Sequence, residues 1–300
     1  MIPNTIHFVF GLDKDFGGKP FSFLHFLAVY SAWKVNRPDN IFFHYHYEPD
    51  TIWWGEAKRY LRLNRVEVPD EVFGNPISHF AHKADVIRLQ QLQKYGGVYL
   101  DLDVVCLNTF EPLRRYDMVM GRQAGTGLCN AVILATAESE FLKAWFDSYR
   151  TFDRGNWSRH SVMLPLELSQ KHPDWIHVEG PYAFFYPVFN EPASARLWAR
   201  PVLLKHRVSW IGRRILDHAG KPGNFHTPLG YIGHTLRSTG WHEQVLSRSY
   251  CVHLWEQLWW EPYLRHLTPA SILQGEDSFS RVFRNVIGKD ELTRVVPLAG

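Results

Sequence analysis

Hydrophobic and polar positions follow two different periods along the first third of this chain. Thr5 to Phe10 alternates as a half-buried strand does, and apolar residues recur at helical spacing between Pro20 and Asn36. The strand period returns over Ile41 to Tyr47. A helix is then predicted over Thr51 to Leu63 and a short strand over Arg65 to Val68.

The stretch from Ala81 to Leu107, AHKADVIRLQQLQKYGGVYLDLDVVCL, has the most distinctive pattern. It predicts an amphipathic helix, a left-handed helix end at Gly96-Gly97, and a buried strand over Val98 to Val105. The order β-α-β-α-β-loop-α-β predicts an α/β fold, a Rossmann-like and mostly parallel sheet with helices on both faces.

Two aspartates, Asp101 and Asp103, lie inside this predicted strand. Residues two apart in an extended chain face the same way, so both carboxylates would point to one side and Leu102 to the other. Adjacent carboxylates repel and are costly to desolvate, and a divalent cation resolves both problems. Mg²⁺ or Mn²⁺ is commonly held by one or two carboxylates and substrate phosphates. We therefore predict a metal–diphosphate site at the carboxyl edge of the sheet, where Phe10 and Gly11 would also lie.

The pattern is weaker after residue 107. Strands are predicted over Tyr116–Gly121, Leu128–Ala135 and Tyr250–Leu254, with helices over Glu138–Tyr149 and Phe279–Ile287 and a frayed tail. Gly212 to Gly240 is rich in Gly, His and Pro, which favours a mobile loop. We expect a single domain with a less regular C-terminal third.

Composition and charge narrow the function. A formal charge of +3 over 300 residues argues against a nucleic-acid partner. The basic residues between Arg196 and Arg214 favour a solvated helix face, and the alternative is a contact surface for an anionic acceptor or for membrane headgroups, which would imply peripheral membrane association. Cys106, Cys129 and Cys251 lie far apart in apolar stretches, which favours buried free thiols. With no signal peptide at the start and no apolar run of membrane-spanning length, we expect a cytoplasmic protein.

The motifs together resemble one enzyme family. IPNTIHFVFG, AHKADVIR, YGGVYLDLD, Asn130-Ala131 in GLCNAVILA, and His253 with Trp255 are similar to motifs of glycosyltransferases whose sugar-binding region contains a D-x-D motif. That group includes α-1,4-galactosyl- and N-acetylglucosaminyltransferases, mannosyltransferases, and capsule and lipopolysaccharide enzymes, with the glucosylating clostridial toxins as distant relatives. The resemblance implies a GT-A fold, with a nucleotide-sugar-binding half over 1–135 and an acceptor and lid half over 136–300.

The resemblance also implies residues for the metal and the donor sugar. Asp103 would be the direct ligand of Mn²⁺ or Mg²⁺, and Asp101 would be shared between metal, ribose and sugar. Asp85 and Arg88, three apart and so on one helix face, would hold the sugar hydroxyls and the diphosphate, although an intrahelical ion pair is the alternative. Asn130 would lie near the donor sugar.

Further matches concern the nucleobase and the diphosphate. Phe10 would stack on the base with Gly11 beside it, or else pack in the core. Tyr99 would lie near the ribose, or simply pack in its strand. His253 would ligate the metal or be structural. Trp255 would reach the diphosphate from a C-terminal lid.

These observations predict a metal-dependent hexosyltransferase. It would move a sugar from a nucleotide-diphosphate sugar to a carbohydrate or glycolipid acceptor, with retention of α-configuration. A UDP-sugar is the favoured donor and GDP-mannose the alternative. Two other classes stay open: a sugar-nucleotide pyrophosphorylase, for which GLDKDFGGK is a weak phosphate loop, and a non-catalytic nucleotide-sugar-binding protein. Donor sugar, acceptor and oligomeric state are not predicted.

Overall fold

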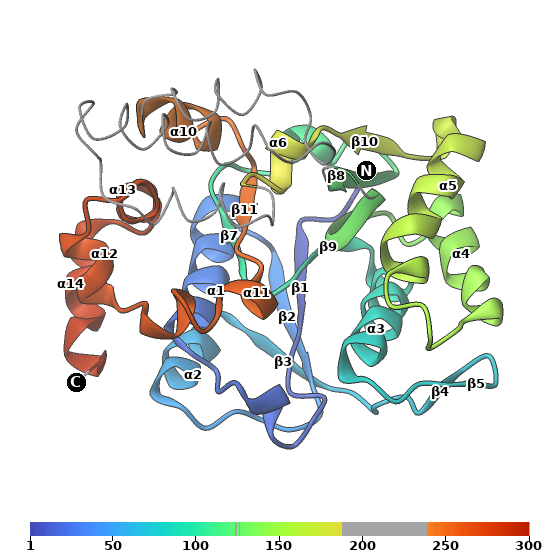
Figure 1. Cartoon of the computed structure of the whole chain (residues 1–300), viewed down its shortest axis with the longest axis horizontal. Helices are drawn as coiled ribbons and strands as arrows, with labels where there is room; N and C mark the ends of the chain where they lie inside the picture. The colour runs from blue at the N-terminus through green and yellow to red at the C-terminus, as the bar shows by residue number, and fades with distance from the viewer. Residues whose placement is uncertain (124, 126, 188–238, 300) are drawn as a thin grey trace, which may run out of the picture.

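A seven-stranded sheet forms the centre of the computed structural model, which describes residues 1–123, 125, 127–187 and 239–299 (Figure 1). Its order is β10-β8-β9-β6-β1-β2-β3. Within this sheet β9 is antiparallel to both of its neighbours, and the other neighbours pair in parallel. The strands are β1 Thr5–Val9, β2 Asn40–Tyr45, β3 Arg62–Arg65, β6 Gly97–Leu100, β8 Met118–Gln123, β9 Gly127–Ala135 and β10 His177–Glu179. The predicted α/β class with a mostly parallel sheet is confirmed.

Helices cover both faces of the sheet (Figure 1). Phe8 and Leu100 belong to a core with apolar residues of α1, whereas Val9 and Tyr99 belong to a second core with α3 and α4. Alternating side chains of one strand thus enter opposite cores, which explains why these strands are apolar throughout. The helices are α1 Phe23–Asn36, α2 Ile52–Ala57, α3 Phe80–Tyr95, α4 Glu140–Asp147, α5 Leu164–Lys171 and α6 Pro181–Phe184.

The C-terminal segment is more regular than expected. After α10 Thr239–Leu246 and α11 Glu256–Trp259, three helices pack together: α12 Pro269–Gln274, α13 Ser278–Ile287 and α14 Lys289–Val295. The predicted frayed tail is wrong, because Leu292 and Val295 of α14 are buried. No described helix is long and apolar enough to cross a bilayer.

Two segments singled out in the sequence fall in the range 188–238, which lies outside the described residues. One is the basic segment Arg196–Arg214. The other is the predicted loop Gly212–Gly240, of which the last two residues are described and begin α10.

The strand predicted over Val98–Val105 is in fact two strands separated by a turn. β6 ends at Leu100, and β7, Val104–Cys106, pairs antiparallel with β11, Cys251–His253, in a separate two-stranded sheet. Between them the Val104 N–H donates to the Asp101 carbonyl oxygen at 3.0 Å. The prediction that strand alternation points the Asp101 and Asp103 carboxylates to one side is therefore wrong in its reason, because a turn and not a strand positions them.

Other boundaries also shift. The helix predicted over Thr51–Leu63 ends at Ala57, and the next strand, β3, comes three residues earlier than predicted, on the exposed edge of the sheet. The predicted loop before α3 holds a small hairpin, β4 Glu71–Val72 and β5 Asn75–Pro76. Neither β10 nor α5 is predicted from the pattern.

A chain of hydrogen bonds joins the end of α3 to the sheet. His7 Nε2 lies 2.9 Å from the Gly96 carbonyl oxygen, His7 Nδ1 lies 3.0 Å from His44 Nε2, and His44 Nδ1 lies 2.8 Å from Asn64 Nδ2. A carbonyl only accepts, so His7 Nε2 donates, and with neutral rings every donor then meets an acceptor. Burial lowers the pKa of His7 to about 4 and that of His44 to about 3.

The double glycine permits a close approach of two backbones. Gly96 and Gly97 have the positive φ values of 62° and 114°, but with ψ of −173° Gly96 does not form the predicted left-handed helix cap. A Cβ on Gly97 would lie 2.4 Å from the Thr5 carbonyl oxygen and 3.1 Å from His7 Nε2. Only glycine allows β6 to begin here beside β1.

Candidate functional site

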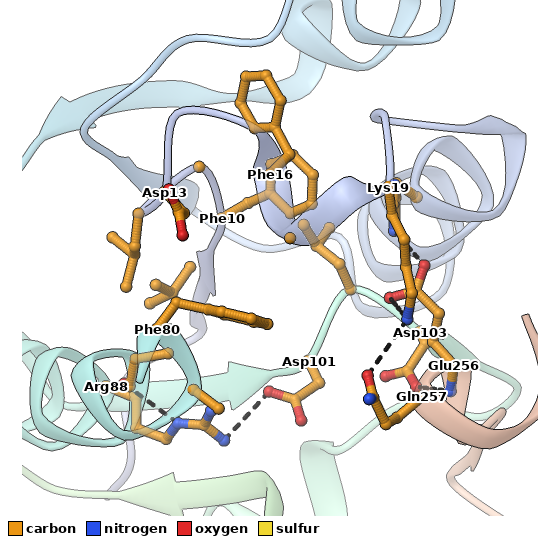
Figure 2. A pocket seen from close by; sticks show the side chains of 18 of the residues that line it. Phe10, Asp13, Phe16, Lys19, Phe80, Arg88, Asp101, Asp103, Glu256 and Gln257 are labelled. Atoms are coloured by element: carbon orange, nitrogen blue, oxygen red, sulfur yellow. Dashed lines mark hydrogen bonds and ion pairs between the residues drawn. The ribbon is translucent and has the colours of Figure 1, made fainter. Parts of the chain in front are cut away.

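A pocket of about 320 Å³ opens at the carboxyl edge of the sheet (Figure 2). Its walls come from the segment after β1, the first half of α3, the turn after β6, and the segment from β11 into α11. The site residues predicted from the sequence that line it are Phe10, Gly11, Arg88, Tyr99, Asp101, Asp103, His253 and Trp255. The pocket therefore lies where a mostly parallel sheet is expected to bind its ligand.

Asp101 is held by two side chains. The Tyr99 hydroxyl donates to Asp101 Oδ1 at 2.6 Å, and Arg88 Nη1 lies 3.1 Å from the same oxygen. The Arg88 guanidinium carbon lies 4.4 Å from the centroid of the Tyr99 ring, which adds a cation–π contact. Burial raises the pKa of Tyr99 well above its ordinary value, so this hydroxyl stays a donor.

Arg88 is also bound on its other side. Its Nη1 donates to the Asn130 carbonyl oxygen at 2.8 Å, its Nε donates to the Ala84 carbonyl oxygen at 3.3 Å, and its Nη2 lies 3.3 Å from Asp85 Oδ1. Asn130 Nδ2 donates to the same Asp85 oxygen at 2.7 Å. Burial raises the pKa of Asp85 although Arg88 opposes this. The structure thus brings the predicted residues together, but Asp85 and Asn130 lie behind Arg88 and do not line the pocket.

Asp103 is bound by the C-terminal segment. Its Oδ1 lies 3.1 Å from His253 Nε2, its Oδ2 accepts the Glu256 backbone N–H at 2.7 Å, and its carbonyl oxygen accepts the Leu254 N–H at 2.9 Å. Burial alone would raise the pKa of Asp103, but the charge and hydrogen bond of His253 and the Glu256 N–H hold it below its ordinary value. Burial alone would lower the pKa of His253, but the charge and hydrogen bond of Asp103 raise it above its ordinary value.

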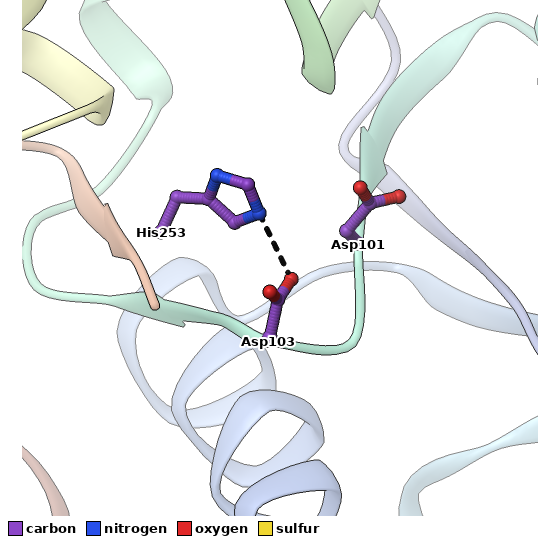
Figure 3. Close-up of side chains that lie close together, drawn as sticks. All are labelled: Asp101, Asp103 and His253. Carbon is purple, nitrogen blue, oxygen red and sulfur yellow. Dashed lines mark ion pairs between the residues drawn. The ribbon is translucent and has the colours of Figure 1, made fainter. Parts of the chain in front are cut away.

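Asp101, Asp103 and His253 fit a divalent cation (Figure 3). One ligand atom from each residue lies within 4.8 Å of the others. His253 Nδ1 is buried and has no hydrogen-bond partner among the described residues, so the ring is bonded only towards Asp103. Carboxylate oxygens and an imidazole nitrogen are suitable ligands for Mn²⁺. The described pocket lining also carries more carboxylates than permanent cations, so an anionic ligand requires added positive charge.

The other end of the pocket is aromatic. Phe10 is half-buried and stacks on Phe16, with ring centroids 5.6 Å apart and planes 9° apart. Phe80 is 39% exposed and faces the pocket from the start of α3 (Figure 2). Gly11 has φ of 67°, and a Cβ there would lie 2.2 Å from the Tyr47 carbonyl oxygen. Phe10 and Gly11 were predicted at this edge, whereas Phe16 and Phe80 were not.

Trp255 lies at the rim of the pocket in a left-handed conformation, with φ of 53°. Its Nε1 donates to the Pro187 carbonyl oxygen at 3.1 Å, so in this structure the N–H expected to reach a diphosphate is bound to backbone. Neither Lys19 nor Glu256, which line the same wall, is among the predicted site residues. Lys19 ends the stretch GLDKDFGGK, which the sequence offers only as a weak phosphate loop, and nothing local singles out Glu256.

Several known proteins are similar to this chain. Residues 27–120 match the family described as "Glycosyltransferase sugar-binding region containing DXD motif". The chain is 32% identical to glucan organizing enzyme 1 of Cryptococcus neoformans var. grubii, over 98% of this chain and 73% of that protein. It is 47% identical to inositol phosphoceramide mannosyltransferase 3 of Schizosaccharomyces pombe, over 17% of this chain and 14% of that protein. Among solved structures, glycosyltransferase GlyE of Streptococcus pneumoniae is similar at 10% identity with a TM-score of 0.45, over 100% of this chain and 64% of that one. The chain therefore belongs to the glycosyltransferases whose sugar-binding region contains a DXD motif.

Proposed function

We propose that this protein transfers a hexose from a nucleotide-diphosphate sugar to a glycan-type acceptor in polysaccharide biosynthesis, using Mn²⁺ or Mg²⁺ and retaining α-configuration. The observation that carries the proposal is the Asp101, Asp103 and His253 cluster, which lies in the wall of a pocket that is aromatic at its other end. A nucleotide sugar has the complementary layout, with a flat base at one end and a diphosphate in the middle. A UDP-sugar is the favoured donor, and GDP-mannose is the second choice.

Asp101, Asp103 and His253 would hold the cation. When bound, the cation supplies Lewis acidity that offsets the negative charge of the departing diphosphate. Arg88 and Tyr99 fix the Asp101 carboxylate, because both contact its Oδ1. Asp85 and Asn130 orient Arg88 from behind. The sequence predicts that Asp85 and Asn130 contact the donor sugar directly. We propose that they also orient Arg88.

The three carboxylates around the proposed cation are each bound by a side chain. Asp101 is bound to Arg88 and Tyr99, Asp103 to His253, and Glu256 to His25. Asp13, the other carboxylate among the described lining residues, is exposed and accepts the Lys14 backbone N–H. This supports a front-face displacement. The acceptor hydroxyl oxygen bonds to C1 as the bond from C1 to the phosphate oxygen breaks, and that phosphate oxygen takes the hydroxyl proton.

We place the acceptor on the side of residues 136–300, which also supply His253 and Trp255 to the pocket. The three cysteines are buried free thiols, which supports a cytoplasmic location because such thiols persist in a reducing compartment. Peripheral contact with a membrane would bring the enzyme to a glycolipid acceptor.

A thermal-shift panel tests the proposal. The wild-type protein is heated with UDP-glucose, UDP-galactose, UDP-N-acetylglucosamine and GDP-mannose, each with and without Mn²⁺. A donor at one hundred times its Kd adds about 2.7 kcal/mol to the free energy of unfolding, which raises Tm by several degrees. Slow release of free sugar and nucleoside diphosphate identifies a transferase, whereas nucleoside triphosphate formed from donor and pyrophosphate identifies a pyrophosphorylase. The proposal fails when no nucleotide sugar shifts Tm.

A further inference from the structure

The positive charge of Arg88 is already balanced within the protein. Two carboxylates, Asp85 and Asp101, lie within 3.3 Å and 3.1 Å of its guanidinium, and the Ala84 and Asn130 carbonyl oxygens accept two of its N–H groups. An arginine held on so many sides has little capacity left for a doubly ionised diphosphate. Of the described residues that line the pocket, Lys19 is the other permanent cation.

Lys19 stands beside Asp103 and Glu256, across the pocket from Arg88 and Phe80 (Figure 2). Its contacts there are long: Nζ lies 3.8 Å from Glu256 Oε2 and 3.4 Å from Gln257 Oε1. Both side chains are about one-fifth exposed (20% and 21%), and at 3.8 Å the ion pair is too long to be a charge-assisted hydrogen bond, so its contribution is small. Lys19 can therefore leave these partners at little cost.

Glu256 stays bound when Lys19 leaves. Its Oε1 lies 3.1 Å from His25 Nε2, and the Ser22 backbone N–H donates to His25 Nδ1 at 2.9 Å. Because Nδ1 accepts, the proton of the neutral ring is on Nε2, which donates to Glu256. The departure of Lys19 therefore leaves no buried carboxylate without a partner, which is the step that would otherwise be costly.

We propose that Lys19 binds the diphosphate of the donor, exchanging the Glu256 carboxylate for a phosphate oxygen. This inference rests on the proposed function, because it takes a nucleoside diphosphate as the ligand. Gly17 and Gly18 precede Lys19 with φ of 66° and 76°, so this lysine follows a glycine turn in the loop between β1 and α1, at the edge of the sheet where ligands bind. Lys19 thereby supplies charge from the wall that also holds Asp103.

The test compares Lys19→Gln with Lys14→Gln, the matched control. Lys14 belongs to the same loop and carries the same charge, but it is exposed and does not line the pocket. Calorimetry at fixed Mn²⁺ gives the Kd of UDP and GDP and of the matching nucleosides, uridine and guanosine. We expect Lys19→Gln to weaken the affinity for the nucleoside diphosphate roughly ten- to a hundredfold, which is the range for a charged hydrogen bond. The affinity for the nucleoside should not change. Lys19→Arg should restore most of the loss.

The outcomes separate the two proposals. Wild-type protein that binds neither UDP nor GDP overturns the proposed function and this inference with it. If the wild type binds UDP or GDP and the Lys19→Gln and Lys14→Gln variants bind it equally strongly, only the Lys19 assignment is overturned. Loss of nucleoside binding in Lys19→Gln also overturns it, because the loop would then act on the base and not on the phosphates.

Discussion

The Gly97→Ala variant should unfold at a markedly lower temperature than a variant that carries alanine at another glycine of positive φ. A non-glycine residue in a left-handed conformation costs about 1–2 kcal/mol. The new Cβ at residue 97 would also lie 2.4 Å from the Thr5 carbonyl oxygen and 3.1 Å from His7 Nε2. Both atoms are buried, so β1 or β6 must shift, which adds about 1–3 kcal/mol of overpacking.

The matched control is Gly74→Ala, at the tip of the β4–β5 hairpin. Gly74 has φ of 81°, but a Cβ there meets nothing within 4 Å, so only the conformational cost applies. With Tm falling by about 2–4 °C per kcal/mol in a chain of this size, we expect a loss of roughly 4–20 °C for Gly97→Ala and roughly 2–8 °C for Gly74→Ala. Circular dichroism during heating measures both. Equal losses in the two variants would refute the close-packing argument, since only the surroundings of the Cβ differ.

Three further predictions concern the site and its support. Asp103→Asn should abolish Mn²⁺ binding measured by calorimetry while Tm stays within a few degrees, because Asn Oδ1 can still accept the Glu256 N–H, and the exposed Asp117→Asn is the control. Arg88→Met should cost about 3–5 kcal/mol in urea unfolding, because it strips the buried Asp85 and the half-buried Asp101 of their counter-charge. Acid should destabilise the fold through His7 and His44. Their folded pKa values of about 4 and about 3 lie below the ordinary 6.5, so the unfolded chain binds protons first, and stability falls as pH drops from 6.5 towards those values.

Each of these has an outcome that contradicts it. Undiminished Mn²⁺ affinity in Asp103→Asn would remove Asp103 from the metal site. Arg88→Met as stable as wild type would show that Asp85 and Asp101 do not need its charge. The acid slope should approach about 1.4 kcal/mol per pH unit for each histidine, and a urea midpoint that stays flat from pH 6.5 to 4 would contradict the assignment of neutral rings.

The part of the fold predicted from the sequence is the part determined by local pattern. β1 and β6 are buried along their length, α1 is buried on all sides over Phe23–Ala32, and β2 and α3 bury part of their surface, so their apolar residues mark them in the chain. The double glycine marks the end of α3 because a close approach there demands it. Once these elements are in order, the edge that carries Phe10 and Asp101 follows from the rules for parallel sheets.

The rest depends on contacts that leave no local trace. Val98 to Val105 is apolar apart from its two aspartates, so its pattern cannot show that the chain turns at Asp101 and leaves one sheet for another. β7 pairs with a strand near residue 252, and Lys19 meets Glu256 and Gln257 across a sequence separation of more than two hundred residues. Such pairings are decided by tertiary packing alone.

The bonds from Asp103 to β11 and α11 have a consequence for synthesis on the ribosome. Asp103 and the Glu256 N–H that it accepts are separated by 153 residues. At roughly 5–20 residues per second, the growing chain waits on the order of ten seconds or more between making the carboxylate and making the group that orients it. A nascent chain that has already folded β1 to β6 still lacks His253 and Glu256. On the proposed function, chains shorter than 256 residues therefore lack part of the proposed cation site and would not hydrolyse donor.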